Sequence, residues 1–261
     1  MDRLADTRLV FDRACEHDKA WQVLLDDWAK EENRYSVGGH LNPLTGWLDV
    51  RLSMSEPPPK RASVIYADLV HNLRATLDHI VCHLVEINGG TCTRSVGFPR
   101  VKNVEHWPSA VERHLVGFPT LWIPEIEAAQ PFQYGTDFRK HPMHVLHELD
   151  IQQKHRTAVH FGVTAIELDF APVFNRPKLL GDRYVLHQPT TEAVEIKDGD
   201  VIARLQPISQ HNDLRITGIK GTHGPLMVGP LSDFTQGIGD ALANLTCFVG
   251  WVLESLAPAF P

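Results

Sequence analysis

Residues 62–88, ASVIYADLVHNLRATLDHIVCHLVEIN, have the features of one long helix, and the predicted fold is organised around it. Three prolines precede the stretch and Gly89-Gly90 follows it, which are start and stop signals of a helix. At about 100° per residue, its apolar side chains fall on one side: Tyr66, Leu69, Val70, Leu73, Leu77, Ile80, Val81 and Leu84. The opposite side carries Asp68, His71, Asn72, Asp78 and His79. Such residues are poor helix formers and unusual on a solvated helix back, so this polar face is the strongest indication of function.

Three more helices are expected. Residues 1–33 place apolar side chains near a heptad seam, and residues 142–158 begin with Pro142, which suits a first helical turn. Residues 231–256 form the last helix, whose small side chains at Gly239, Ala243, Cys247 and Gly250 would let the apolar face of 62–88 approach closely. The sequence therefore predicts a helical core of about four long helices, 1–33, 62–88, 142–158 and 231–256.

Strand patterns occupy two other regions. Residues 35–54 predict a hairpin around the turn 42–46, and residues 160–229 alternate polar and apolar side chains around an Asp198-Gly199 turn. The predicted fold class is α+β, in which the helical core carries one antiparallel β-sheet of about five to seven strands built from 35–54 and 160–229. The length of 261 residues fits a single elaborated domain, 1–261.

Composition limits the class of protein. The net charge of −7 argues against a broadly basic nucleic-acid surface, and no DNA-binding motif is present. The four cysteines are widely spaced, so no disulfide framework or zinc knuckle is implied. The charged N-terminus does not resemble a signal peptide, and the uncharged run 241–253 is shorter than the roughly 20 residues that cross a bilayer. We expect a cytoplasmic protein that does not enter a membrane.

The first candidate site is Arg74 and His79 on the central helix. A histidine that moves a proton and an arginine that stabilises a phosphate could cleave RNA without a metal or other cofactor. Their spacing puts them about 140° apart around the helix, so a homodimer would help two copies to converge. The alternative is structural, with Arg74 paired to Asp78 one turn further along the helix.

The segment Arg74–His79 resembles the Arg-x4-His motif of the HEPN superfamily (higher eukaryotes and prokaryotes nucleotide-binding). This resemblance implies a metal-independent endoribonuclease or RNA-binding protein of a bacterial toxin or phage-defence system, acting as a homodimer with Arg74 and His79 as catalytic pair. The longer stretch HNLRATLDH, together with Lys154-His155-Arg156, also resembles a widespread uncharacterised bacterial family.

The second candidate site combines the polar face of 62–88 with residues 142–158. If the two helices pack together, a phosphate or carboxylate pocket could form. Its binding residues would be His71, Asn72, Asp78, Glu148, Lys154, His155 and Arg156, with Asp68 and His79 beside them. The alternative is a non-catalytic ligand-binding or interaction protein whose His/Asp/Asn network is structural.

A metal-dependent hydrolase is the third reading. His79 and His83 lie one helical turn apart, and His144 with His147 or Glu148 could complete a site. No His-Glu-x-x-His motif, dinucleotide fingerprint or phosphate loop is present, so the sequence predicts no metal and no cofactor.

Overall fold

The computed structural model describes residues 2–30, 35–155, 160–169, 184–187, 198–207, 220–228 and 238–260. The chain divides into two compact units. Unit 1 comprises residues 1–22, 63–159 and 240–261, and unit 2 comprises residues 23–62 and 160–239. Each is described separately, and one elaborated domain stays a prediction.

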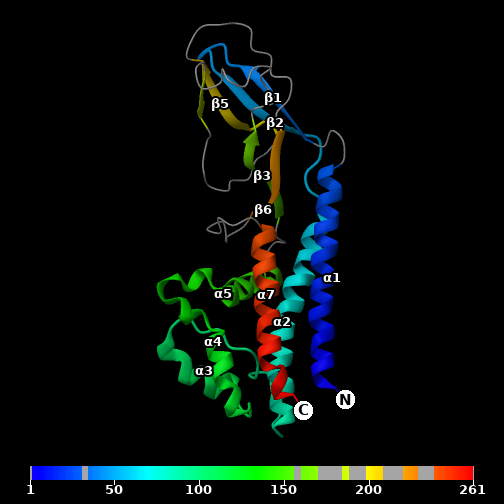
Figure 1. Ribbon diagram of the computed structural model, residues 1–261, viewed down its shortest axis with the longest axis vertical. Helices are drawn as coiled ribbons and strands as arrows, with labels where there is room; N and C mark the ends of the chain where they lie inside the picture. Colours follow the sequence, from blue (N-terminus) through cyan, green and yellow to red (C-terminus); the bar gives the residue numbers. More distant parts are fainter. Residues whose placement is uncertain are drawn as a thin grey trace. The chain divides into compact units, whose positions relative to one another are not determined.

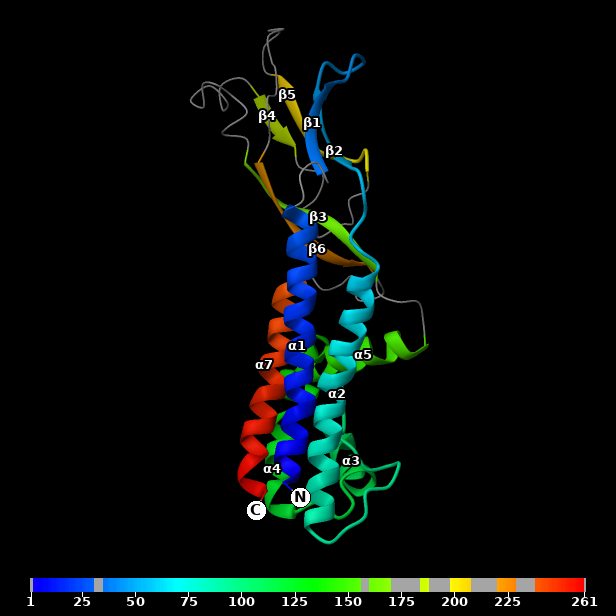
Figure 2. The ribbon, with the colours of Figure 1, turned by 90° about the vertical axis from the view of Figure 1, so that its right-hand side faces the viewer.

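Three long helices form the core of unit 1 (Figures 1 and 2): α1 (Arg3–Lys30), whose first part belongs to this unit, α2 (Arg61–Ile87) and α7 (Ile238–Leu256). All eight apolar side chains predicted on the buried side of α2 are at most 1% exposed. The long predicted helices are therefore present, and α2 lies within one residue of its predicted limits at each end. The predicted helix residues 31–33 and 231–237 lie outside the described residues.

α1 runs antiparallel to both of its neighbours. Near its start Thr7 Oγ1 lies 2.9 Å from His83 Nδ1 of α2, and near its end Trp21 packs against Tyr66. Arg8 of α1 forms an ion pair with Glu254 of α7. Three of the four small residues of α7 do not face α2 as predicted: a Cβ at Gly250 would lie 3.2 Å from the Phe11 ring of α1, and Ala243 and Cys247 are exposed. The surroundings of Gly239 lie outside the described part.

α2 ends where the two glycines predict. Gly89 adopts φ of 80°, a conformation that side-chain-bearing residues rarely adopt, and its N–H donates to the Glu86 carbonyl. The Gly90 N–H donates to the Val85 carbonyl at 2.8 Å. The chain then turns back along α2, and Cys92 reaches Cys82 in a disulfide with Cα atoms 5.2 Å apart. The sequence reading implied no disulfide framework, so this bridge is a correction.

The segment that returns from α2 holds short helices joined by proline-rich turns. These are α3 (Trp107–His114), α4 (Ile123–Ala128) and the 3-10 helices Val104–His106, Thr120–Trp122 and Pro131–Lys140, followed by α5 (Pro142–His155). A further 3-10 turn, Ala257–Ala259, follows α7. Pro99, Pro108, Pro119 and Pro124 break this segment into short pieces, because a proline disfavours the α conformation of the residue before it.

Unit 2 contains the strands. β1 (Tyr35–Leu41) and β2 (Leu48–Met54) form the predicted hairpin, and β5 (Val201–Pro207) and β4 (Tyr184–His187) extend it to the order β1-β2-β5-β4. Among the described strands, β3 (His160–Asp169) and β6 (Lys220–Val228) pair with each other and with no third strand. The Asp198-Gly199 turn precedes β5, while the strands expected at 195–197 and around Leu214 lie outside the described residues.

The prediction of one antiparallel sheet of about five to seven strands is wrong. In the described chain the strands form a four-stranded sheet and a separate two-stranded sheet, and six α-helices make helix the main structure. The physical reason is that a period of two identifies a strand but does not say which other strand it pairs with. The class nevertheless remains α+β.

One stretch of the described chain, Ala241–Ala259, is long and apolar enough to cross a bilayer by length and composition. Buried core helices meet the same criteria, and Leu242, Leu245, Val249 and Val252 of this stretch are at most 2% exposed. It is therefore weak evidence for a membrane span.

Candidate functional site

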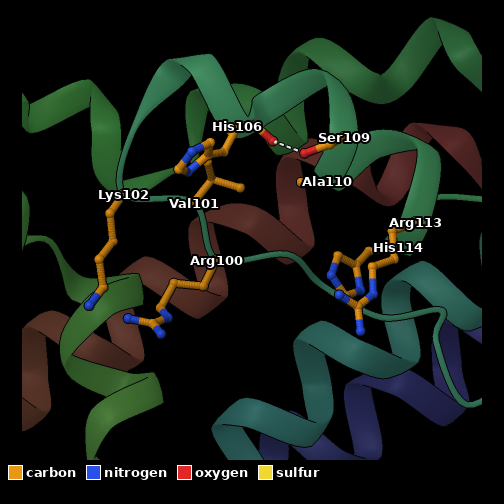
Figure 3. Close-up of a pocket in the computed structure, with 8 residues that line it drawn as sticks. All are labelled: Arg100, Val101, Lys102, His106, Ser109, Ala110, Arg113 and His114. Atoms are coloured by element: carbon orange, nitrogen blue, oxygen red, sulfur yellow. Dashed lines mark hydrogen bonds between the residues drawn. The ribbon is translucent and has the colours of Figure 1, made fainter.

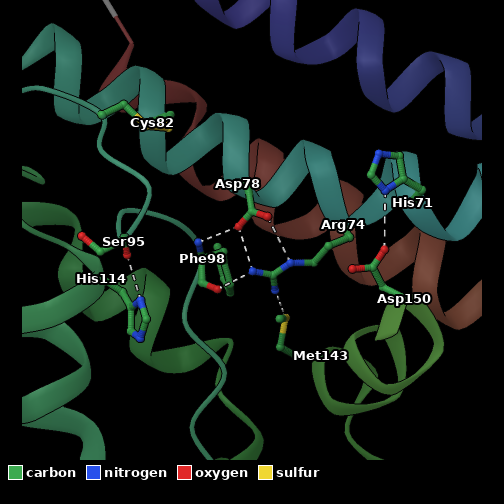
Figure 4. Close-up of polar contacts among 10 residues, drawn as sticks. His71, Arg74, Asp78, Cys82, Ser95, Phe98, His114, Met143 and Asp150 are labelled. Carbon is green, nitrogen blue, oxygen red and sulfur yellow. Dashed lines mark hydrogen bonds and ion pairs between the residues drawn. A yellow bond between two sulfur atoms is a disulfide. The ribbon is translucent and has the colours of Figure 1, made fainter. Parts of the chain in front are cut away.

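The Arg74 guanidinium forms hydrogen bonds with Asp78 and Phe98 of unit 1 (Figure 4). Its Nε and Nη2 donate to the two carboxylate oxygens of Asp78 at 3.2 and 2.8 Å, and Nη2 also donates to the Phe98 carbonyl at 2.7 Å. Asp78 in turn accepts the Phe98 N–H at 2.9 Å. The backbone approaches so closely that a Cβ at Gly97 would lie 3.0 Å from Asp78 Oδ1. The Arg74–Asp78 pair therefore fastens the loop around Phe98 to α2.

The other polar residues of α2 contact either α5 or α2 itself. His71 Nδ1 lies 3.5 Å from Asp150 Oδ1 of α5, whereas the Asn72 side chain donates to the Asp68 carbonyl of its own helix at 2.6 Å. His79 is exposed, and its ring centroid lies 5.7 Å from that of His83. Arg74 and His79 are thus not brought together within one chain.

The predicted metal ligands have other contacts. His83 Nδ1 lies 2.9 Å from Thr7 Oγ1 and 3.1 Å from the Arg3 carbonyl, and His144 Nδ1 accepts from Arg100. Across the described ranges, no group of three or more His, Cys, Asp or Glu side chains is arranged to hold a metal ion.

A cationic cluster forms where the loop after Phe98 meets α5. Arg100 Nη1 donates to Glu148 Oε1 at 3.0 Å and to His144 Nδ1 at 3.1 Å, and Lys102 Nζ lies 4.0 Å from the same glutamate oxygen. Burial lowers the pKa of Arg100, Glu148 raises it, and the nearby Arg74 lowers it further. The Nε of Arg100 is buried and has no hydrogen-bond partner in the described chain. Arg100 therefore keeps an unused donor.

Three histidines of this region are held neutral. Burial lowers the pKa of His141, His144 and His147 from 6.5 to about 4, and for His144 and His147 neighbouring positive charges add to the effect. For His144 these charges are Lys102 and Arg100, and for His147 they are Arg100 and Arg74. The geometry agrees for two of them, since His141 Nδ1 accepts the Met143 N–H and His144 Nδ1 accepts from Arg100.

These histidines predict a stability that falls in acid. Their folded-state pKa lies below the unfolded value, so the unfolded chain binds more protons, and the stabilisation present above pH 6.5 is lost as the pH falls toward about 4. Urea unfolding from pH 7.5 to 4 should show this decline. The double variant His144→Gln/His147→Gln should have a flatter profile, while the control His40→Gln, which changes an exposed histidine of unit 2, should keep the wild-type slope. A variant profile as steep as wild type would contradict the assignment.

A basic groove lies between this loop and α3 (Figure 3). It is a cavity of about 310 Å³ whose polar lining is Arg100, Lys102, His106, Ser109, Arg113 and His114, with no carboxylate among the described lining residues. His106, Ser109 and Arg113 share one face of a helical segment by their spacing. Figure 3 shows Arg100 and Lys102 on one side of the opening, with Arg113 and His114 on the other.

Two anchors fix the walls of the basic groove. Gln130 is fully buried, and its Oε1 accepts the Val101 N–H at 3.0 Å, which fixes the backbone between Arg100 and Lys102. His114 Nδ1 donates to the Ser95 carbonyl at 2.9 Å. Because that bond defines the tautomer, the other ring nitrogen of His114 is left for a different partner.

The predicted binding pocket is only partly assembled. α5 meets α2 through Asp150 and His71, but Glu148 contacts Arg100 rather than the polar face of α2. Lys154 and His155 lie in α5 with side chains outside the described part, and Arg156 lies outside the described residues. The roles assigned to these residues, to Asn72 and Asp78, and to the pair Arg74 and His79 stay predictions.

Sequence reasoning missed the residues of the basic groove. Two signals were available: the pair Arg100 and Lys102 in a loop that follows Pro99, and the 106-109-113 spacing of polar side chains. Neither is specific alone, because the groove exists only once the loop and α3 are brought together.

Comparison with known proteins found no matching family model, no matching curated protein and no matching solved structure. The likeness to the HEPN superfamily and to the uncharacterised bacterial family therefore remains a resemblance of short motifs.

Proposed function

We propose that unit 1 binds a phosphate-bearing ligand in the basic groove. The observation that carries this proposal is the lining, which combines two arginines, a lysine and two histidines without a carboxylate among the described lining residues. In a chain of net charge −7, such a concentration of cations is a local exception. Cationic cavities concentrate anions, and arginine donates two parallel hydrogen bonds to phosphate.

The size of the groove suits a small phosphorylated molecule or the phosphate of one nucleotide. Ligand pockets commonly have volumes from about 300 Å³ upward, and this cavity has about 310 Å³. The charge of Arg100 supports the same conclusion, because a hydrogen bond from a charged donor to an anion is stronger than one between neutral groups. The groove thus offers charge, donors and a fitting volume together.

A HEPN-like metal-independent endoribonuclease, acting as a homodimer, is the second proposal. The exposure of His79 favours it, because a general acid or base has to reach the substrate. The Arg74 guanidinium is instead paired with Asp78 and Phe98, so cleavage would require it to leave these contacts. We therefore place ligand binding first.

Phosphate binding should depend on Arg113 of the groove. Affinity is measured by calorimetric titration with pyrophosphate and with a short single-stranded RNA. Arg113→Gln should bind each about 10-fold more weakly than wild type, since a hydrogen bond to a charged group contributes about 1.5–3 kcal/mol. Arg13→Gln is the matched control, because it removes an exposed arginine of α1 that pairs with Glu16 outside the groove.

Equal affinities in the two variants would contradict the basic groove as the binding site, and so would wild-type protein that binds neither probe. The same RNA samples, kept in excess EDTA, separate the two proposals. Cleavage by wild type that His79→Ala loses would support the ribonuclease, whereas binding without cleavage would support the ligand-binding protein.

A further inference from the structure

We infer that Glu148 is a built-in competitor of the basic groove, and that an incoming phosphate displaces its carboxylate from Arg100 and Lys102. This inference rests on the proposed function, because it assigns a regulatory role to a residue beside the same site. Glu148 does not line the cavity, yet its Oε1 lies 3.0 Å from Arg100 Nη1 and 4.0 Å from Lys102 Nζ. Both of these cations do line it.

The position of Glu148 is that of an anion already bound. A single carboxylate oxygen faces two cations, Arg100 and Lys102, at 3.0 and 4.0 Å from their nitrogens. This is the arrangement in which one phosphate oxygen would accept from several donors. Glu148 raises the pKa of both Arg100 and His144, so its charge stabilises the positive forms of its neighbours as a ligand anion would.

Glu148 is also free to leave. Its side chain is 35% exposed, whereas that of Arg100 is 20% exposed and stays in place against His144. Its second oxygen, Oε2, has no hydrogen-bond partner in the described part of the chain. Rotation toward solvent therefore breaks contacts on one oxygen only, and water replaces them.

Displacement has a cost that lowers the affinity of the groove. A ligand gains the contacts that Glu148 now makes, with Arg100 Nη1 and Lys102 Nζ, only after that carboxylate is displaced. A dianion beside an undisplaced carboxylate would be repelled. Phosphate, with more charge and more acceptor oxygens than a carboxylate, can outcompete Glu148 where a monocarboxylate cannot. The competitor thus selects for phosphate among anions.

The test is calorimetric titration of the full chain with pyrophosphate. Glu148→Gln keeps the size of the side chain but removes its charge, and it should bind about 10-fold more tightly than wild type, since one charge-assisted contact no longer has to be broken. Glu148→Asp, whose shorter side chain holds Arg100 less well, should fall between them. Glu112→Gln is the control: it removes the same charge from an exposed residue of α3, next in sequence to Arg113 of the groove, and should change affinity by less than about 2-fold.

The outcomes separate this inference from the proposed function. Binding by wild type with unchanged or weaker affinity in Glu148→Gln would overturn the competitor role and leave phosphate binding intact. An equal gain in Glu148→Gln and Glu112→Gln would show general electrostatics and also overturn it. Absence of pyrophosphate binding in wild type and in every variant would contradict both the competitor role of Glu148 and phosphate binding in the basic groove. If Glu148→Gln does not fold, as checked by its thermal unfolding, Glu148→Asp carries the comparison alone.

Discussion

Replacing Arg74 with leucine should lower the free energy of unfolding by about 2–3 kcal/mol. Breaking a buried ion pair by removing one partner typically costs about 3–5 kcal/mol, and the loss is smaller here because Asp78 is 38% exposed and can be partly hydrated. The change also removes the donor to the Phe98 carbonyl. Urea unfolding of the purified variant measures the effect.

The matched control for Arg74→Leu is Arg13→Leu. Arg13 and Glu16 form an ion pair on α1 with side chains 60% and 63% exposed, and such pairs contribute roughly 0–1 kcal/mol. A double-mutant cycle with Asp78→Ala should show that the two losses are not additive, because Arg74 and Asp78 share one contact. If Arg74→Leu is no less stable than the Arg13 control, the Arg74–Asp78 contact does not fasten the loop. Activity assays on Arg74 variants need this stability measurement beside them.

Reducing the Cys82–Cys92 disulfide should also cost about 3 kcal/mol of stability. The bridge spans 10 positions of sequence, and closing a loop of about that length restricts the unfolded chain by roughly this amount. Urea unfolding with and without a reductant should show the difference in wild type. The double variant Cys82→Ser/Cys92→Ser should be as unstable as the reduced protein and should not respond to the reductant.

Thiol counting gives an independent check of the disulfide. Unreduced protein that has been unfolded should expose two thiols, those of Cys15 and Cys247, and reduced protein should expose four. Four thiols before reduction would contradict the bridge. The thiol count is made on protein purified without reductant, because a reductant would break the bridge. The cytoplasmic location inferred from the sequence stays a prediction, and disulfides persist mainly in oxidising compartments.

The helices of unit 1 were predictable because their signals are local. The apolar positions of α2 repeat with the helical period. The helix stops at Gly89, whose positive φ is a local property of glycine that can be anticipated from the sequence. The division of the strands between two sheets was not predictable, since fifty residues separate β3 from β6 and nothing in either strand identifies its partner.

The candidate site shows the same limit more sharply. The pairing of Arg74 with Asp78 follows from their four-residue spacing on a helix, and was one of the two readings kept open. The basic groove depends on Gln130 holding Val101, and on His114 reaching Ser95, which are contacts between residues nineteen or more positions apart. Long-range contacts of this kind leave no periodic trace in the sequence.

The contrast between the basic groove and the charge of the whole chain has a kinetic consequence. A local patch of positive potential on a chain of net charge −7 attracts a phosphorylated ligand only at short range, because the distant field repels it. Adding salt shortens both ranges, with a Debye length of about 8 Å at physiological ionic strength. The long-range repulsion is then screened before the short-range attraction is, so moderate salt should speed the association of such a ligand, whereas it slows association with a uniformly basic protein.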